Sequence, residues 1–129
     1  EYIFVPEHIT IQIGAMPPQI KADYTQFKQL FQNLITNAVK FIDKDEGKVK
    51  ILYESDELFY KFSISDNGIG IDEKYHHKIF NVFQSLTKDT KSSGIGLSIV
   101  NKIVNLYGGK IWLESKLGQG TTFFFTIKK

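Results

Sequence analysis

The sequence predicts a single domain of the α/β class. Segments that alternate apolar and polar residues, the period of a half-buried strand, are interleaved with segments whose apolar residues recur every three or four positions, the period of an amphipathic helix. The length of 129 residues suits one hydrophobic core. No internal repeat or long linker divides the chain, so a second domain is not expected.

The first three elements expected are a strand, a helix and a strand. Residues 9–13 alternate with the strand period. Asp23 is placed to cap a helix, with Gln26 three positions further on. Residues 49–53 form the next strand. The apolar stripe of the helix consists of Phe27, Leu30, Phe31, Leu34, Ile35, Ala38 and Ile42.

The second half of the chain predicts five more elements. Residues 58–66 alternate most regularly, and residues 72–83 follow as a short capped helix. A glycine-containing segment at 92–96 leads into another helix. Strands at 110–115 and 121–127 flank a glycine-rich loop and are consistent with a hairpin. The core-facing residues of the last helix are Leu97, Val100, Ile103, Val104 and Tyr107.

The composition excludes several kinds of chemistry. The chain has no cysteine, and all 16 of its basic residues are lysines, so thiol nucleophiles, zinc ribbons and arginine clamps on phosphate are absent. The net charge of +2 is scattered, which argues against a nucleic-acid partner. No segment resembles a signal peptide or reaches the roughly 18 apolar residues of a membrane span. We expect no direct membrane contact.

Three polar residues gather beside the apolar stripe of the first helix. Asn33, Asn37 and Lys40 share this edge at helical spacing. Taken alone, they favour an ordinary solvated helix edge. The functional alternative is that an amide oxygen suits Mg²⁺ and that a lysine ammonium meets phosphate as a point charge.

Asp66 has the parity of the apolar residues in its strand, so its carboxylate is directed toward the core side. Two interpretations stay open: a cap for the following turn, or a polar anchor in an apolar pocket for a group such as the adenine amino group. The glycine pairs Gly68/Gly70 and Gly94/Gly96 are, taken singly, typical of turns. The second pair also opens a helix, where backbone N–H groups favour phosphate.

Two further features have ordinary structural interpretations. His8, His76 and His77 lack a further ligand at metal-binding spacing, and the adjacent pair points apart on a helix, so surface or partly packed positions are expected. The run Phe123-Phe124-Phe125 is predicted to be a core strand.

Five segments, taken in order, resemble the ATP-binding catalytic domain of sensor histidine kinases, within the superfamily that includes DNA gyrase, the chaperone Hsp90 and MutL. The resemblance covers about residues 9–128. The segments are NLITNAVKF at 33–41 (N box), DNGIGI at 66–71 (G1 box), IFNVF at 79–83 (F box), SGIGLSIV at 93–100 (G2 box) and GQGTTF at 118–123 (final glycine box).

The resemblance implies an α/β sandwich in which about three helices pack on one face of a mixed sheet. It places ATP between the N-box helix and a mobile lid at about residues 84–93. It implies that Asn37 coordinates Mg²⁺ and that Asp66 accepts the adenine amino group. The implied nucleotide-binding residues are Asn33, Asn37, Lys40, Asp66, Gly68, Gly70, Ile71, Lys88, Lys91, Gly94, Ile95, Gly96, Leu97 and Thr121.

Two departures from the family pattern refine this expectation. Asn33 stands where the ATPase branches carry a glutamate that activates water, so hydrolysis is not the expected reaction. Gln84, Ser85 and Leu86 follow the F box where many relatives place arginine, and Lys88 or Lys91 would substitute. No catalytic residue is assigned, because the nucleophile would come from another domain.

The expected function is that of the catalytic domain of a two-component sensor histidine kinase. Residues 1–8 are expected to be the tail of an upstream linker, and residues 9–129 the domain itself. The resemblance implies two partners, a histidine-bearing dimerisation domain of the same protein and a response regulator, and a cytoplasmic, monomeric domain whose parent protein could be membrane-anchored. The alternatives are a serine kinase of the anti-sigma type and a degenerate nucleotide-binding module that serves protein interaction.

Overall fold

A computed structural model describes residues 6–17, 19–76 and 95–129 of the chain. Its elements follow the order expected from the sequence. They are β1 (Ile9–Ile13), α1 (Tyr24–Lys40), β2 (Gly47–Ser55), β3 (Phe59–Asp66), a single 3₁₀ turn η1 (Glu73–Tyr75), α2 (Ile95–Leu106), β4 (Ile111–Lys116) and β5 (Gly120–Lys128).

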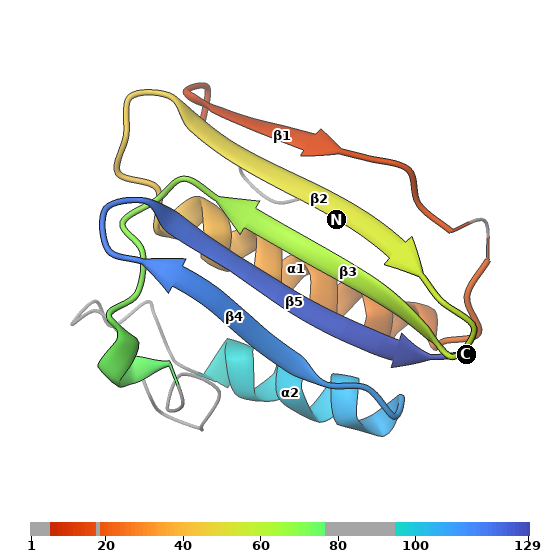
Figure 1. The fold of residues 1–129 in the computed structure, drawn as a ribbon. Coiled ribbons are helices and arrows are strands. Elements are labelled where there is room, and N and C mark those ends of the chain that lie inside the picture. The colour runs from red at the N-terminus through yellow and green to blue at the C-terminus, as the bar shows by residue number, and fades with distance from the viewer. Residues whose placement is uncertain (1–5, 18, 77–94) are drawn as a thin grey trace.

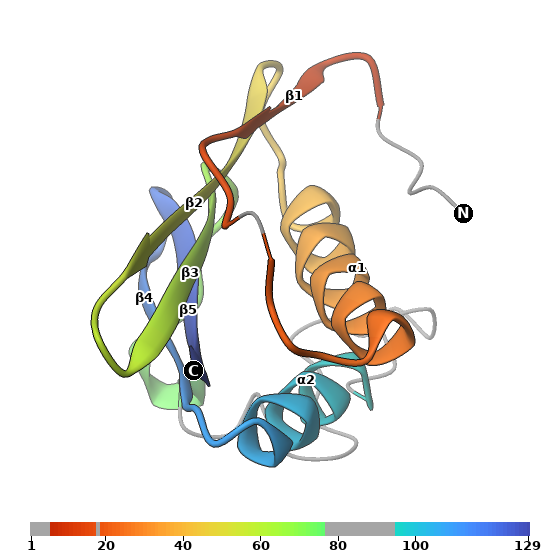
Figure 2. The same ribbon diagram turned by 90° about the vertical axis from the view of Figure 1, so that its right-hand side faces the viewer.

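The five strands form one mixed sheet in the order β1-β2-β3-β5-β4 (Figure 1). β1 runs parallel to β2, and the other neighbouring pairs are antiparallel, including the predicted β4–β5 hairpin. Both helices cover the same face of the sheet (Figure 2). The predicted α/β class and mixed sheet are therefore confirmed.

The third predicted helix is described only at its start, and the predicted lid is not described. Of the helix expected at residues 72–83, the described part contains the turn η1, which Asp72 caps by accepting a hydrogen bond from the Lys74 N–H at 3.1 Å. The remainder of that segment and the lid at 84–93 lie outside the described residues. The described part of the chain therefore contains two α-helices.

The core lies between the sheet and the two helices. The fully buried side chains of α1 are Leu30, Leu34 and Ala38, as the helical stripe predicts. Phe62 stacks on Phe125 with 5.0 Å between ring centroids, and the ring of Phe31 meets both rings edge-on. The buried and partly buried residues of this core alternate along the strands as expected for a sheet that is covered on one face.

The start of α1 is fixed by hydrogen bonds of Asp23, only one of which the sequence predicts. The predicted cap is present, because the Asp23 carboxylate accepts from the Gln26 N–H at 2.9 Å. The helix ends at Lys40, so Ile42 lies beyond it but still packs against the core. Tyr107, just after α2, receives a hydrogen bond from the Asp23 N–H at 2.8 Å, and this contact holds the two helices together.

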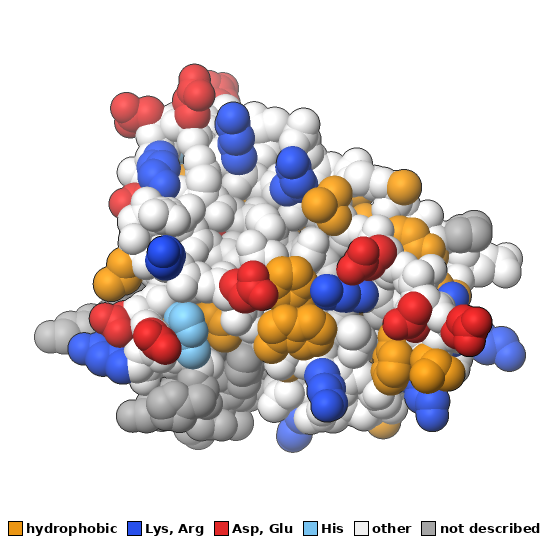
Figure 3. Space-filling model, in the orientation of Figure 1, with side chains coloured by type: hydrophobic (Ala, Val, Ile, Leu, Met, Phe, Trp, Pro, Cys, Tyr) orange, Lys and Arg blue, Asp and Glu red, His pale blue; other side chains and the backbone are white. Residues whose placement is uncertain are grey.

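The other face of the sheet is open. Trp112 and Phe124 stack there with 5.4 Å between ring centroids, and the Lys61 ammonium lies 5.0 Å from the Phe124 centroid. Hydrophobic side chains gather at the centre of this face (Figure 3). Phe123 and Phe125 point into the core instead, so the predicted core strand is confirmed with its middle phenylalanine on the opposite face. Within the described ranges, no helix has both the length and the hydrophobicity that a bilayer crossing requires.

Candidate functional site

Several predicted site residues meet at one end of the molecule. The C-terminal end of α1, the N-terminal end of α2, the end of β3 and the start of β5 all lie at that end (Figure 1). The turn after β3 is joined directly to the end of α1, because the Ile69 N–H donates to the Phe41 carbonyl oxygen at 2.9 Å. This bond uses a carbonyl that the end of a helix leaves without an intrahelical partner.

The two asparagines of α1 carry buried polar atoms without a partner. Asn33 and Asn37 are four residues apart and therefore neighbours on one face of the helix. The Nδ2 atom of each is buried and has no hydrogen-bond partner among the described residues. A buried donor left unsatisfied costs roughly 1–3 kcal/mol. The solvated-edge interpretation therefore does not hold for the two asparagines, whose amide nitrogens are available to a ligand, whereas Lys40 is exposed.

Asp66, at the end of β3, makes the turn cap that was one of its two interpretations, and its carboxyl is largely buried as well. Its Oδ1 caps the following turn by accepting from the Gly68 N–H at 2.8 Å. Burial nevertheless raises the pKa of this carboxyl to about 6, although hydrogen bonds from the backbone of Gly68 and Thr121 and the positive charge of Lys44 act to lower it. Asp66 is thus a largely desolvated acid held in a fixed orientation.

The glycines of the turn are required by close backbone contacts. A Cβ atom on Gly68 would lie 2.2 Å from the Phe41 carbonyl oxygen. Gly70 has a φ of 78°, and a Cβ there would lie 2.1 Å from the Lys116 carbonyl oxygen. Any larger residue would push the turn away from α1 or from the β4–β5 hairpin.

Thr121 and Ile71 are joined to Asp66 through β5 and β4. Thr121 lies directly opposite Asp66 in the β3–β5 ladder. The Ser115 hydroxyl accepts from the Ile71 N–H at 2.7 Å and lies 2.7 Å from the Thr121 hydroxyl. The structure therefore brings Asp66, Ile71 and Thr121 together, as the predicted site requires.

The remaining predicted residues are placed only in part. Lys40 is exposed at the end of α1, and Ile95 and Gly96 begin α2, followed by the half-buried Leu97. The first turn of α2 lies at the same end of the molecule as the end of β3 (Figure 1). Gly94, Lys88 and Lys91 lie outside the described residues.

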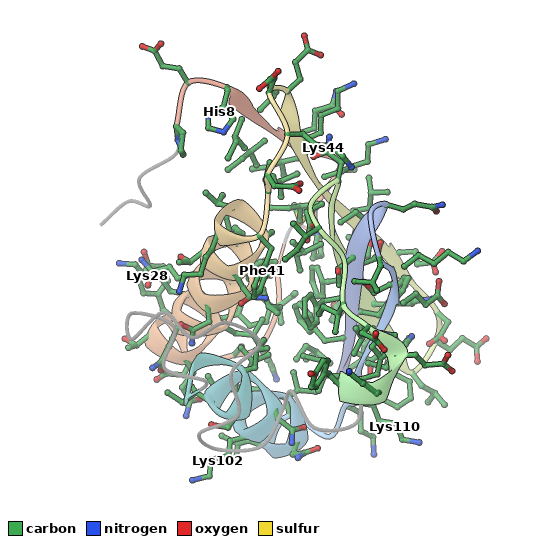
Figure 4. The ribbon with its side chains drawn as sticks, turned by 90° about the vertical axis from the view of Figure 1, so that its left-hand side faces the viewer. His8, Lys28, Phe41, Lys44, Lys102 and Lys110 are labelled. Atoms are coloured by element: carbon green, nitrogen blue, oxygen red, sulfur yellow. The ribbon has the colours of Figure 1, made fainter. Side chains whose placement is uncertain are left out.

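Three residues of this region were not predicted from the sequence. Lys44, in the loop between α1 and β2, donates to the Asn67 carbonyl oxygen at 2.7 Å and lies beside the turn that follows β3 (Figure 4). Asn67 accepts from the Lys48 N–H at 2.8 Å, and Ser115 makes the contacts given above. Asn67 lies within the G1 box but was given no role there, and Lys44 and Ser115 lie outside the five motifs. The partners of all three are backbone or hydroxyl groups, most of them distant in sequence.

The histidines are not gathered into a site. A ring nitrogen of His76 lies 2.8 Å from the Ile71 carbonyl oxygen, which is the partly packed position expected for it, and His8 is exposed. His77 lies outside the described residues. Among the described residues, no three His, Cys, Asp or Glu side chains cluster in a way that could hold a metal.

Comparison with known proteins decides the family. The family model described as "Histidine kinase-, DNA gyrase B-, and HSP90-like ATPase" matches residues 22–129. The chain belongs to this family. It is a catalytic, ATP-binding domain of the histidine kinase type, as its five ordered motifs predicted.

Individual relatives of this histidine kinase-type domain support the assignment. Over 119 residues, the chain is 45% identical to the phytochrome-like protein Cph1 of Synechocystis sp., a match that covers 91% of the chain and 16% of Cph1. It therefore spans about a sixth of the length of that relative.

Solved structures give the same result. The nucleotide-free catalytic domain of histidine kinase ThkA is 34% identical with a TM-score of 0.78, covering 95% of this chain and 81% of that one. Full-length ShkA in complex with AMPPNP is 30% identical with a TM-score of 0.76, covering 92% of this chain and 25% of that one.

Proposed function

We propose that this domain binds Mg²⁺-ATP beside the C-terminal half of α1 and donates the γ-phosphoryl group to a histidine on a separate dimerisation domain of its parent protein. The observation that carries the proposal is the pair of buried, unpartnered amide nitrogens of Asn33 and Asn37 in the C-terminal half of α1, together with the largely buried carboxylate of Asp66 at the end of β3. The AMPPNP complex of ShkA supports a nucleotide as the ligand.

The base would be recognised at the end of β3. Ionised Asp66 accepts a hydrogen bond from the exocyclic amino group of adenine, and Thr121 lies next to it across the ladder. Gly68 and Gly70 allow the turn to stay close to α1 and to the hairpin, which shapes this side of the site. The desolvated surroundings of Asp66 strengthen its hydrogen bond to the ligand.

The phosphates would be held at the ends of α1 and α2. A side-chain amide can present either its oxygen or its nitrogen after a rotation of its terminal group, so the donor set of Asn33 and Asn37 fits a hydrated metal ion or a phosphate oxygen. Asn37 is the proposed ligand of Mg²⁺, which when bound neutralises phosphate charge. Lys40 provides a further positive charge.

The N-terminal end of α2 provides backbone donors. Helix N-termini carry unpaired N–H groups and the positive end of the helix dipole, so the amides near Ile95, Gly96 and Leu97 are suited to phosphate oxygens. Gly94, Lys88 and Lys91 are proposed to complete this side of the site. With no arginine in the sequence, phosphate charge is balanced by lysine, backbone N–H groups and the metal ion.

Phosphoryl transfer would rely on positioning and not on a base within this chain. Asn33 occupies the position of the activating glutamate in the hydrolytic branches, and an amide is not a general base. The nucleophile therefore comes from another domain. We infer that this domain is cytoplasmic and belongs to a parent protein, membrane-anchored or not, that contains this histidine-bearing domain and signals to a response regulator. Residues 1–8 would be the end of the preceding linker and residues 9–129 the domain.

A transfer assay tests the proposed reaction. The domain is incubated with γ-labelled ATP, Mg²⁺ and a supplied histidine-bearing dimerisation domain, and acid-labile, base-stable label on the acceptor is the expected product. Label on a serine of a partner protein would instead indicate a serine kinase. Binding of ATP without transfer to any supplied acceptor would indicate an interaction module, and rapid release of phosphate would indicate an ATPase.

Asn37→Leu provides a second test that separates ligand binding from folding. Leucine has the same branched shape with methyl groups in place of the amide oxygen and nitrogen, and it removes the unsatisfied donor, so we expect the nucleotide-free domain to be stabilised by roughly 1–2 kcal/mol. The Mg²⁺ dependence of ATP binding, measured by calorimetry with and without the metal, should be lost. Thr36→Leu, on the exposed face of the same helix turn, is the matched control and should keep that dependence. An unchanged metal dependence in Asn37→Leu would exclude Asn37 as the ligand.

A further inference from the structure

Lys44 joins the two loops beside the partly buried end of β3. Its ammonium donates to the carbonyl oxygen of Asn67 at 2.7 Å and to that of Gly118 at 3.2 Å. Asn67 belongs to the turn after β3, and Gly118 belongs to the loop between β4 and β5. One side chain from the α1–β2 loop therefore connects three separate segments of the chain.

The two connected loops pack directly against Asp66 and its neighbours. The Gly118 N–H donates to the Ile69 carbonyl oxygen at 2.7 Å, which is a second link between the same loops. A Cβ on Gly120 would lie 2.1 Å from the Asp66 carbonyl oxygen, so the β4–β5 loop leaves no free space there. A shift of either loop would displace Asp66 or Thr121.

We propose that Lys44 is a positioning residue for the nucleotide site: it holds the turn after β3 and the β4–β5 loop together, and so fixes Asp66 and Thr121 for the base. This inference rests on the proposed function. Lys44 contacts backbone atoms and not the ligand, so its effect on binding passes through Asp66 and the loop geometry. Hydrogen bonds from a charged donor are worth more than neutral ones, which suits a short, two-acceptor link.

The charge of Lys44 should also change the pH dependence of binding, which a purely structural role would not do. Its ammonium favours the ionised form of the Asp66 carboxyl, against the burial that raises the pKa. Lys44 is the charged side chain that acts on the pKa of Asp66, although it is exposed like most of the other charged groups on the elements packed around Asp66. Those other groups are Lys40, Asp43, Asp45, Glu46, Lys48, Lys50, Asp72, Glu114 and Lys116.

The test compares three substitutions at Lys44 with a charge-matched control. Lys44→Met removes both the donors and the charge, Lys44→Gln keeps a donor, and Lys44→Arg keeps both. Lys50→Met removes the same charge from an exposed position on β2. ATP affinity is measured by calorimetry from about pH 5 to about pH 8, the range in which a raised carboxyl pKa has its effect. Thermal unfolding of each variant is recorded alongside.

Lys44→Met should weaken ATP binding about three- to tenfold at neutral pH, and the loss of binding on acidification should begin at a higher pH than in the wild type. Lys44→Gln should restore part of the wild-type ATP affinity but not the wild-type pH midpoint of binding, because it keeps a donor and lacks the charge. Lys44→Arg should restore both. Lys50→Met should match the wild type.

Two results would overturn the inference. If Lys44→Met and Lys50→Met have the same affinity and pH midpoint while the wild type binds ATP, Lys44 does not position the site. If Lys44→Met only lowers the melting temperature and leaves both binding parameters unchanged, its role is structural. Absence of ATP binding by the folded wild type would instead remove the proposed function, and this inference with it.

Discussion

Asp66→Asn is expected to weaken ATP binding by roughly 100-fold while making the nucleotide-free domain more stable. In the wild type, Oδ1 of Asp66 accepts from the Gly68 N–H at 2.8 Å. An asparagine can keep that bond only with its single oxygen, which turns its NH₂ group toward the ligand. A donor then faces the amino group of adenine, and the buried site is left with unpaired polar groups.

The stability change follows from the raised pKa of Asp66. Burial raises this pKa from 3.8 to about 6, so the folded state binds more protons than the unfolded state between those values. The free energy of unfolding therefore falls as the pH rises through that window, and the destabilisation is complete above it. An asparagine side chain does not titrate, so the Asp66→Asn variant should gain at most about 3 kcal/mol of unfolding free energy at neutral pH. Solvent reaches part of the carboxyl, and this lowers the gain.

Calorimetry with ATP and urea unfolding between about pH 4 and about pH 8 measure both effects. Asp45→Asn, which removes an exposed carboxylate from the α1–β2 loop, is the matched control and should change neither. Nucleotide binding by the wild type should itself weaken as the pH falls through about 6, because Asp66 becomes protonated. An Asp66→Asn variant that binds ATP normally would contradict the proposed base contact.

Phe62→Ala is expected to lower the free energy of unfolding by about 3–5 kcal/mol. The Phe62 side chain is 1% exposed, and its ring lies 5.5 Å from that of Phe31 and 5.0 Å from that of Phe125. Truncation removes the ring that joins α1 to the centre of the sheet and leaves a cavity. A loss of this size is a large part of the total stability of a small domain.

Urea unfolding of Phe62→Ala should be compared with that of Phe124→Ala. Phe124 is half-buried on the open face of the sheet and stacks on Trp112, so its removal should cost only about 1–2 kcal/mol. If Phe62→Ala does not fold, Phe62→Leu gives a measurable intermediate loss. Equal losses for the two alanine variants would show that the core does not depend on the contact between α1 and the sheet.

The sequence predicted most elements because their local patterns agree with the tertiary structure. Asp23 caps α1 as its spacing with Gln26 suggested, and the parity of Asp66 placed its carboxylate on the buried side. The end of α1 was predicted less well, because the apolar pattern continues to Ile42 after the helical hydrogen bonds have ended. Ile42 packs on the core from the loop after the helix, so at this position an apolar residue at helical spacing is not itself helical.

The supporting residues of the candidate site could not be predicted in the same way. Lys44 meets Asn67 and Gly118 at separations of 23 and 74 residues, and its acceptors are backbone carbonyls that any residue type can supply. Lys44 also sits in a charged turn that is typical of a solvated loop. Of the two alternatives for Asp66, the structure shows the turn cap, made by one carboxyl oxygen of a largely buried group, and the ligand anchor stays a prediction.

The strand order has a consequence for how the domain folds. β5 lies between β3 and β4 in the sheet, although it follows both in the chain. Asp66 therefore acquires its ladder partner Thr121 only after a loop of about 55 residues has closed, which is entropically costly and slow. On a ribosome, β1, α1, β2 and β3 emerge long before β5. The core phenylalanines of β3 and α1 thus remain without the rings of β5 until synthesis of the domain is nearly complete, and in that interval they are accessible to chaperones.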